Sequence, residues 1–215
     1  RIKSAKNIAQ ITKAMELVAA SKMKKAQQAA LAGKLYAQKI YDMVVELSSR
    51  TDISNHPLLS KPKMVTDKRL VIFLSTNKGL CGGLNTNLFR YALKEGFVGS
   101  NRDVVVMGKK AIGFLLASKS SIKADFSDTT PFSQHVPAVT QLITNEYLSG
   151  RYDGVDLVYN EFISAIKQVP RRKTILPLSI ELSAEEKRQL SEFLIEPSVP
   201  EVFDRLIPHY LENQV

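Results

Sequence analysis

The part of this sequence best suited to bind an anion is the segment Ser75–Asn85, which contains three glycines. It follows an apolar run of strand length, Leu70–Leu74, and precedes a helical pattern. Backbone N–H groups at the start of such a helix attract phosphate groups. The glycines read Gly79-x-x-Gly82-Gly83, however, and lack the G-x-G-x-x-G order of dinucleotide-binding loops. We therefore expect a turn or an interface loop here, with nucleotide binding by the Gly79–Gly83 loop as the alternative.

Other residues that could support catalysis or metal binding are scattered. Gly108-Lys109 is followed by Lys110 instead of Ser or Thr, so a P-loop is excluded. The single cysteine, Cys81, has no second cysteine to resolve an oxidised form, and a small buried residue is the preferred interpretation over a reactive thiol. Glu185-Glu186 is typical of a solvated loop. The three histidines, His56, His135 and His209, lack H-x-x-x-H spacing, and no G-x-S-x-G elbow occurs. We therefore expect no catalytic residue, no metal and no cofactor.

Composition indicates a folded chain of ordinary solubility. Of the 215 residues, 44% are hydrophobic and 24% are charged, a balance that gives no reason to expect global disorder. The longest apolar stretch, Ala111–Ala117, is far shorter than the roughly 20 residues that span a bilayer. One cysteine excludes an internal disulfide framework, and the first residues lack the apolar core of a signal peptide. A reducing compartment and no insertion into a membrane are the expectations.

The net charge of +9 is concentrated at the start of the chain. Residues 1–49 hold 9 basic and 3 acidic side chains, whereas the remaining 166 residues hold 21 and 18. A solvated helix face is the simplest interpretation of such a run. A basic helix that binds nucleic acid is a further alternative, although residues 1–35 contain no aromatic side chain that could stack on bases.

The first fifty residues predict one long helix. Ile2–Ser49 contains no proline and a single glycine, Gly33, and such a helix would be about 70 Å long at 1.5 Å per residue. Apolar and small residues recur along it at spacings of three and four, which is typical of the seam of a coiled coil. This seam needs a second helix, and the partner is expected to be another chain or a segment outside this sequence. The predicted seam residues are Ile8, Ile11, Met15, Val18, Ala19, Ala26, Ala30, Gly33, Ala37, Ile40, Val44 and Leu47.

The rest of the chain predicts an α/β domain with a mainly parallel, Rossmann-like sheet, because strand and helix patterns alternate. Strands are expected at 70–74, 103–107 and 155–159, with an edge strand at 174–179, and helices at 85–94, 109–118, 134–148 and 200–214. The expected organisation is a coiled-coil helix at 1–50, a linker at 51–68, the α/β domain at 69–197 and a closing helix at 198–215.

Three segments together resemble a known family. Ile11–Ala26, Ser75–Asn87 and the pair Glu196-Pro197 before the closing helix are similar, in this order, to the gamma subunit of bacterial F-type ATP synthase. The resemblance covers essentially the whole chain. It implies that the first helix pairs with a long C-terminal helix in an antiparallel coiled coil, and that most of this second helix lies beyond Val215.

The resemblance also implies the function and the partners. A gamma subunit is the non-catalytic central rotor that couples proton flow through the membrane-embedded c-ring to ATP synthesis or hydrolysis by the alpha and beta subunits, and the α/β domain holds the epsilon subunit. The implied location is peripheral, on the cytoplasmic face of the bacterial inner membrane, without nucleic acid as a partner.

Two groups of contact residues are carried over by the resemblance. The first faces an acidic loop of the beta subunits and comprises Lys13, Lys22, Met23, Lys24 and Lys25. The second forms the foot near the membrane ring and comprises Phe193, Ile195 and Glu196. Exposed ion pairs are worth only about 0–1 kcal/mol each, so stiffness and shape are expected to carry most of the torque.

Overall fold

A computed structural model describes residues 1–50, 56–60, 66–100, 102–128, 131–179, 196 and 198–215. The chain divides into two compact units, Arg1–Met43 and Val44–Val215. The pair Glu185-Glu186, expected in a solvated loop, and the expected foot residues Phe193 and Ile195 lie outside the described residues.

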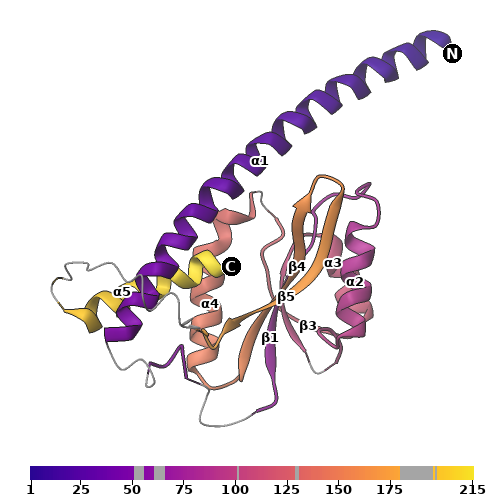
Figure 1. The fold of residues 1–215 in the computed structure, drawn as a ribbon. Coiled ribbons are helices and arrows are strands. Elements are labelled where there is room, and N and C mark those ends of the chain that lie inside the picture. The colour runs from indigo at the N-terminus through magenta and orange to yellow at the C-terminus, as the bar shows by residue number, and fades with distance from the viewer. Residues whose placement is uncertain (51–55, 61–65, 101, 129–130, 180–195, 197) are drawn as a thin grey trace. The chain divides into compact units, whose positions relative to one another are not determined.

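The first unit is helical throughout. It forms most of α1 (Ile2–Arg50), a single uninterrupted α-helix of 49 residues (Figure 1). Alanine, lysine, glutamine, methionine and leucine dominate this sequence and favour helix, and no proline interrupts the backbone hydrogen bonds. The predicted long N-terminal helix is confirmed. Every residue from Arg1 to Ala26 is exposed, so in this part of α1 the side chains are not buried in a core.

The second unit is built on a five-stranded sheet with the order β3-β2-β1-β4-β5. The first four strands in this order are parallel, and β5 is antiparallel to β4. The predicted α/β fold with a mainly parallel sheet is confirmed. The strands are β1 (Arg69–Leu74), β2 (Asp103–Met107), β3 (Ser121–Asp125), β4 (Gly154–Ser164) and β5 (Lys167–Leu176).

Helices cover both faces of this sheet. On one face lie α2 (Leu84–Lys94) and α3 (Lys110–Ala117), and on the other lies α4 (Val136–Leu148), preceded by the short 3₁₀ helix η1 (Phe132–His135) (Figure 1). Helix α5 (Val199–Gln214) packs beside α4 and runs through Pro208 without interruption.

Alternate residues of each central strand supply the two cores, as the pleat of a strand requires. The core under α2 and α3 contains Val71, Phe73, Leu88, Ala92, Val104, Val106, Ala111, Leu115 and Val158. The opposite face buries Leu70, Ile72, Val105, Val155 and Leu157, together with Val139 and Ile143 of α4 and Ile207 and Leu211 of α5.

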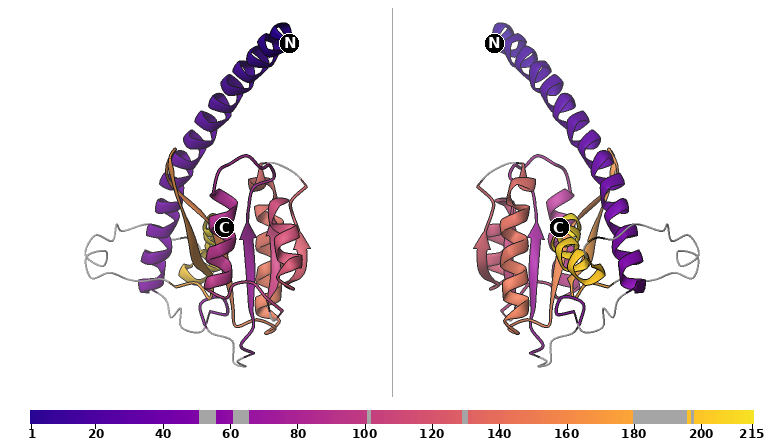
Figure 2. Two further views of the ribbon diagram at one scale, coloured as in Figure 1. Left: turned by 90° about the vertical axis from the view of Figure 1, so that its right-hand side faces the viewer. Right: turned by 90° about the vertical axis from the view of Figure 1, so that its left-hand side faces the viewer.

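Two strands differ from the prediction. Strand β3 was not expected, because its side chains alternate between exposed and half-buried positions and form no apolar run. The edge strand was expected at 174–179, but β5 begins at Lys167 and ends at Leu176, before Pro177. Strand β4 is correspondingly longer than expected, and Figure 2 shows β4 and β5 as one long hairpin (orange). The outer part of this hairpin was not predicted, because it contains polar residues such as Asn160 and Arg171 and therefore forms no apolar run.

Strand β1 pairs with β4 only as far as Phe73 opposite Val158. Beyond that point the hairpin continues as a two-stranded ribbon, Tyr159–Ser164 with Lys167–Arg171. Its tip carries apolar side chains that are at least half exposed: Phe162, Ile163 and Ile166.

Candidate functional site

The segment Ser75–Asn85 begins where β1 ends, at the carboxyl edge of the sheet. The Ser75 backbone N–H donates to the carbonyl of Met107 at 2.7 Å, and its hydroxyl donates to the carbonyl of Gly108 at 2.8 Å. The same hydroxyl oxygen accepts a hydrogen bond from the Ala111 N–H at 3.0 Å. Buried Ser75 therefore joins the ends of two neighbouring strands to the first turn of α3.

Asn85 closes the segment with its side-chain amide. Its Nδ2 donates to Thr76 Oγ1 at 2.8 Å and lies 3.3 Å from Cys81 Sγ, while its Oδ1 accepts from the Thr76 N–H at 3.3 Å. The thiol of Cys81 is half-buried as a result of this arrangement. One asparagine thus holds both ends and the middle of the loop in place.

The backbone donors at the start of α3 are also occupied from within the chain. The Lys109 N–H donates to Asn77 Oδ1 at 2.9 Å, and the Lys110 N–H donates to the Thr76 carbonyl at 3.0 Å. With Ala111 bound to Ser75, three successive amides face protein acceptors, although amides at this place would otherwise attract a phosphate. These three amides at the start of α3 are therefore engaged within the protein.

The tip of the loop points an apolar side chain outward. Leu80 is fully exposed and adopts a φ of 60°, in the left-handed region that residues other than glycine rarely occupy. Gly82 has the same φ of 60°. A single exposed leucine is common on protein surfaces and does not by itself identify a partner.

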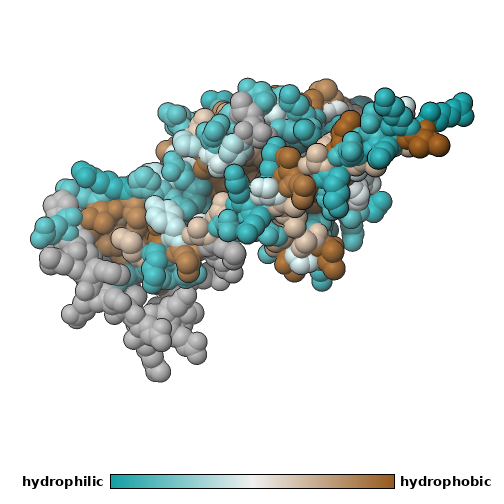
Figure 3. Space-filling model, turned by 90° about the horizontal axis from the view of Figure 1, so that it is seen from above, coloured by the Kyte–Doolittle hydropathy of each residue, from teal (hydrophilic) through white to brown (hydrophobic). Residues whose placement is uncertain are grey.

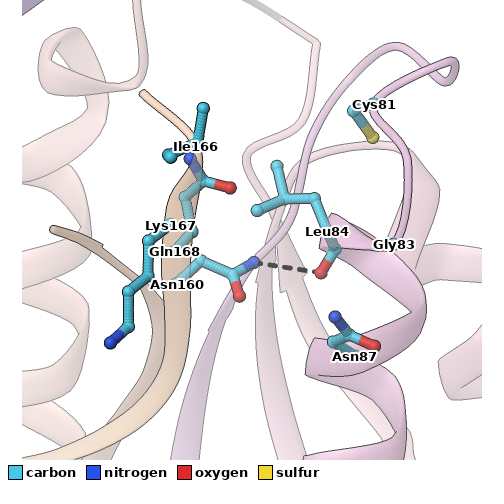
Figure 4. A pocket seen from close by; sticks show the side chains of 8 residues that line it. All are labelled: Cys81, Gly83, Leu84, Asn87, Asn160, Ile166, Lys167 and Gln168. Atoms are coloured by element: carbon cyan, nitrogen blue, oxygen red, sulfur yellow. Dashed lines mark hydrogen bonds between the residues drawn. The ribbon is translucent and has the colours of Figure 1, made fainter. Parts of the chain in front are cut away.

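A shallow pocket of about 280 Å³ lies between the start of α2 and the β4–β5 hairpin (Figure 4). Asn160 Nδ2 of the hairpin donates to the carbonyl of Leu84 at 3.3 Å and holds the two walls together. The described residues that line it include no carboxylate and no imidazole. They are Cys81, Gly83, Leu84, Asn87, Asn160, Ile166, Lys167 and Gln168.

The three histidines serve local structure. His56 Nδ1 accepts the Leu58 N–H at 3.2 Å, and its ring packs edge-on against Phe203. Burial lowers the pKa of His56, and Asp204, whose Oδ1 is 3.6 Å from Nε2, opposes this shift only partly. His135 and His209 pair with Asp128 at 3.5 Å and Glu212 at 3.8 Å. Across the described ranges, no group of three or more metal-binding side chains occurs.

One buried charge of the second unit, Asp156, belongs to the sheet. The Asp156 carboxylate accepts hydrogen bonds from Arg69 Nη2 at 2.7 Å, from Arg172 Nε at 2.9 Å and from Thr174 Oγ1 at 3.1 Å. Burial alone would raise the pKa of Asp156, but the hydrogen bonds from Arg69 and Arg172 outweigh it and hold this pKa below its usual range. Asp153, just before β4, accepts hydrogen bonds from the N–H groups of Thr66 and Asp67, just before β1, and these bonds lower the pKa of Asp153.

The expected contact residues of α1 are all exposed, but they do not share one face. Since each helical residue advances by about 100°, Lys13 and Lys24 lie roughly 160–180° around the helix from Lys22. Met23 and Lys25 occupy intermediate positions. A run of neighbouring lysines in the sequence therefore surrounds the helix.

The predicted seam is exposed in its first part. The side chains of Ile8, Ile11, Met15 and Val18 are each more than half exposed, whereas Ile40, Val44 and Leu47 are buried. A β-carbon added to Gly33 would have no heavy atom within 4 Å, so a side chain would meet open space there. Glu196 of the expected foot is exposed. None of the described helices is long and apolar enough to cross a membrane.

Sequence reasoning missed the side-chain network of Asn85, the Asp156 cluster and the exposed hairpin tip. Asp156 did carry a signal, because a carboxylate inside the apolar run Val155–Tyr159 must find partners if the strand is buried. No sequence signal pointed to the hydrogen bonds of Asn85, since any of several polar residues in the loop could have made such bonds.

Comparison with known proteins places these features in a family. A family model described as ATP synthase matches residues 1–215. The ATP synthase gamma chain of Opitutus terrae is 36% identical over 230 residues, which cover all of this chain and 76% of that protein. The gamma chain of Legionella pneumophila is 35% identical over 225 residues, with the same coverage.

A solved structure has the same fold. A chain from the central stalk and c-ring of the Tetrahymena thermophila mitochondrial ATP synthase matches with a TM-score of 0.61 and 22% sequence identity, covering 95% of this chain and 88% of that one.

Proposed function

The chain belongs to the ATP synthase gamma-chain family, and from this membership we propose that it is the central rotor of an F-type ATP synthase. In this role it couples proton flow through the membrane c-ring to ATP synthesis or hydrolysis at the alpha and beta subunits. The coupling is by rotation, and the chain contributes shape and stiffness instead of catalytic groups.

The observation that carries this proposal is α1 itself. A helix of 49 residues with heptad-spaced, exposed apolar side chains at Ile8, Ile11, Met15 and Val18 cannot bury its seam within Arg1–Met43. An exposed row of apolar side chains of this kind marks a surface to which a partner binds. Pairing with a second helix would make a coiled-coil shaft, which resists bending and can transmit torque.

The α/β unit is suited to binding partner subunits and not to catalysis. Its loop at the carboxyl edge of the sheet is fixed by Asn85, and its buried Asp156 is paired within the sheet. We assign to this unit the epsilon subunit and the neighbourhood of the c-ring as partners. The complex then places the chain peripherally at the cytoplasmic face of the bacterial inner membrane.

Purification of the native protein under mild conditions tests the proposal. We expect the alpha, beta, epsilon and c subunits to co-purify with it, and proteoliposomes of this complex to pump protons when ATP is added. The opposite result is a protein that purifies alone and, in equilibrium dialysis with labelled ATP, binds one nucleotide. If substitutions in the Gly79–Gly83 loop abolished that binding, the nucleotide-binding alternative would replace the rotor.

A further inference from the structure

A turn at residues 56–60 ties separate elements of the second unit together, and we call this turn the clasp. The carbonyl oxygen of Leu58 accepts the N–H of Leu178, just after β5, at 2.8 Å. The carbonyl oxygen of Ser60 accepts the hydroxyl of Tyr147, on α4, at 2.8 Å. Leu58, Tyr147 and Leu178 are all buried. The clasp is therefore anchored in the interior of the unit.

The side chain of His56 connects the clasp to α5. Its ring packs edge-on against buried Phe203, with 5.7 Å between the ring centroids. Its Nδ1 accepts the N–H of Leu58, inside the clasp, at 3.2 Å. The backbone carbonyl of His56 accepts the N–H groups of Leu59 and Ser60, each at 3.0 Å. His56 thus both shapes the clasp and holds it against α5.

The hydrogen bond between His56 and Leu58 requires a neutral ring. An imidazole nitrogen accepts a hydrogen bond only when it carries no proton, so the single proton of the neutral His56 ring lies on Nε2. A second proton would have to bind Nδ1, toward which the Leu58 N–H already points. The two hydrogens would then face each other, and the N–H of buried Leu58 would lose its acceptor. The closed clasp and a charged ring are therefore incompatible.

The surroundings of the ring do not compensate for this loss. Of the described residues, Asp204 on α5 is the charged group that acts on His56, with 3.6 Å between Asp204 Oδ1 and His56 Nε2. The side chain of Asp204 is 68% exposed, so water screens its attraction for a charged ring. Residues 57–60 of the clasp carry no charge. Burial lowers the pKa of His56, and Asp204 raises it by less, so the neutral ring is favoured.

We propose that His56 is a pH-dependent switch that closes and opens the clasp. While the ring is neutral, the clasp stays closed on α4, α5 and the end of β5. When the ring takes up a proton, Nδ1 releases the Leu58 N–H, the charged ring leaves its place beside Phe203, and the clasp opens locally while the sheet stays folded. Acidification thereby loosens the attachment of α5.

This inference goes beyond the proposed rotor function and does not depend on it. It rests on the hydrogen bonds of one turn and not on the character of the surface. Figure 3 shows hydrophilic and hydrophobic side chains interspersed over one face of the molecule, so surface hydropathy alone does not reveal such a switch.

Amide hydrogen exchange, followed by NMR on the full-length chain from pH 7.5 to pH 5, tests the switch. Protection factors of the Leu58 and Leu178 amides are corrected for the intrinsic rate of an unfolded chain at each pH, so that a change reports opening of the clasp. The variant that cannot titrate is His56→Asn. An asparagine oxygen can accept the N–H two residues later, and asparagine before Pro57 favours such a turn. The matched control is His135→Asn, at a histidine outside the clasp that also faces an aspartate.

We expect both protection factors of the wild type to fall more than about threefold from pH 7.5 to pH 5, because opening of the clasp takes up a proton. His135→Asn should show the same fall, and in His56→Asn the change should be less than about twofold. Asp204→Asn should extend the fall to lower pH, because the carboxylate favours the charged ring.

A smaller fall in the wild type, or an equal fall in His56→Asn, overturns the inference. The nitrogen chemical shifts of the His56 ring give a second measurement, which needs no variant to fold. At pH 7.5 they should place the proton on Nε2, and a proton on Nδ1 would exclude the switch. None of these outcomes bears on assembly with the alpha and beta subunits, which tests the rotor function separately.

Discussion

Asp156 and Arg69 form an ion pair between neighbouring strands, with the carboxylate only 1% exposed and Arg69 Nη2 2.7 Å from Asp156 Oδ1. Arg172 on β5 completes the arrangement and also places its guanidinium over the ring of Phe97 at 5.5 Å. One carboxylate thereby links β1, β4 and β5. Because all its oxygens accept hydrogen bonds, the charge is tolerated inside the unit.

Asp156→Asn should lower the free energy of unfolding of the α/β unit by about 1–3 kcal/mol at pH 7, because Arg69 and Arg172 lose the counter-charge to which both are hydrogen-bonded. Urea unfolding monitored by circular dichroism measures this. Asp128→Asn, at an exposed carboxylate, should change the stability by less than about 0.5 kcal/mol. A loss for Asp156→Asn as small as the control would show that the pair does not support the sheet.

Acid should destabilise the same unit. The folded-state pKa values of Asp156 and Asp153 lie below those of the unfolded chain, so their contribution is complete above the ordinary aspartate range and is lost as the pH falls through the folded-state values. The lowered pKa of His56 also reduces stability as the pH falls, and it does so at a higher pH than the aspartates. The reason is that His56 takes up a proton in the unfolded chain at a pH where it is still neutral in the folded chain. We expect the denaturant concentration at the unfolding midpoint to decrease as the pH is lowered from 7 to 3. The slope in the acidic part of this range should be smaller in Asp156→Asn.

Gly108 should not tolerate a side chain. It has a φ of 103°, and a β-carbon there would overlap the backbone carbonyl of Ser75. Gly108→Ala should therefore destabilise the unit by at least about 2 kcal/mol, from backbone strain and from displacement of Ser75. Gly150→Ala is the matched control, since it has a φ of 74° but open space around it, and should cost about 1 kcal/mol. Equal losses would mean that the contact with Ser75 is unimportant.

Asn85→Ala should open the Ser75–Asn85 loop, because Thr76 and Cys81 lose their shared partner. We expect Cys81, the single cysteine of the chain, to react several-fold faster with a thiol reagent, and the stability to fall by about 1–3 kcal/mol. Asn87→Ala, at an exposed position of the same helix, should change neither quantity. Unaltered thiol reactivity in Asn85→Ala would indicate that the loop holds its shape without this amide.

Gly33→Leu should have opposite effects in the free chain and in the complex. In the free chain it should increase helicity, since glycine inside a helix costs about 1 kcal/mol relative to good helix formers and nothing lies within 4 Å. In the assembled complex it should weaken helix pairing by overpacking a close approach. Gly113→Ala on α3, also without neighbours, should stabilise the chain and leave assembly unaltered. Normal assembly of Gly33→Leu would place Gly33 outside the seam.

The strands that could be predicted from the sequence alone are those that are buried and consist of apolar residues. The runs Leu70–Leu74 and Val104–Met107 are buried on both faces and were found as strands, and the absence of proline before Arg50 gave the helix. Strand β3 and the outer half of the hairpin were missed because backbone pairing, and not side-chain burial, holds them in the sheet. Local pattern says little about such pairing.

The candidate contact residues were only partly predictable for a related reason. Spacing by threes and fours located the seam, but the basic residues were grouped by their closeness in sequence. Helical geometry separates Lys22 from Lys24, although one residue lies between them, and joins Lys24 to Lys13. The Asn85 network depends on how β1, α2 and α3 meet, and no property of residues 75–85 alone encodes it.

The strand order has a consequence for synthesis of the chain. Arg69 pairs with Gly154, so the ribosome must add more than eighty residues after β1 before its second neighbour in the sheet exists. Helix α1, by contrast, needs only local hydrogen bonds and can form as soon as it emerges. A nascent polypeptide therefore displays exposed apolar side chains of α1, such as Ile8, Ile11 and Met15, while its sheet is still incomplete. During that interval it is a natural client for a chaperone that shields helical apolar surface.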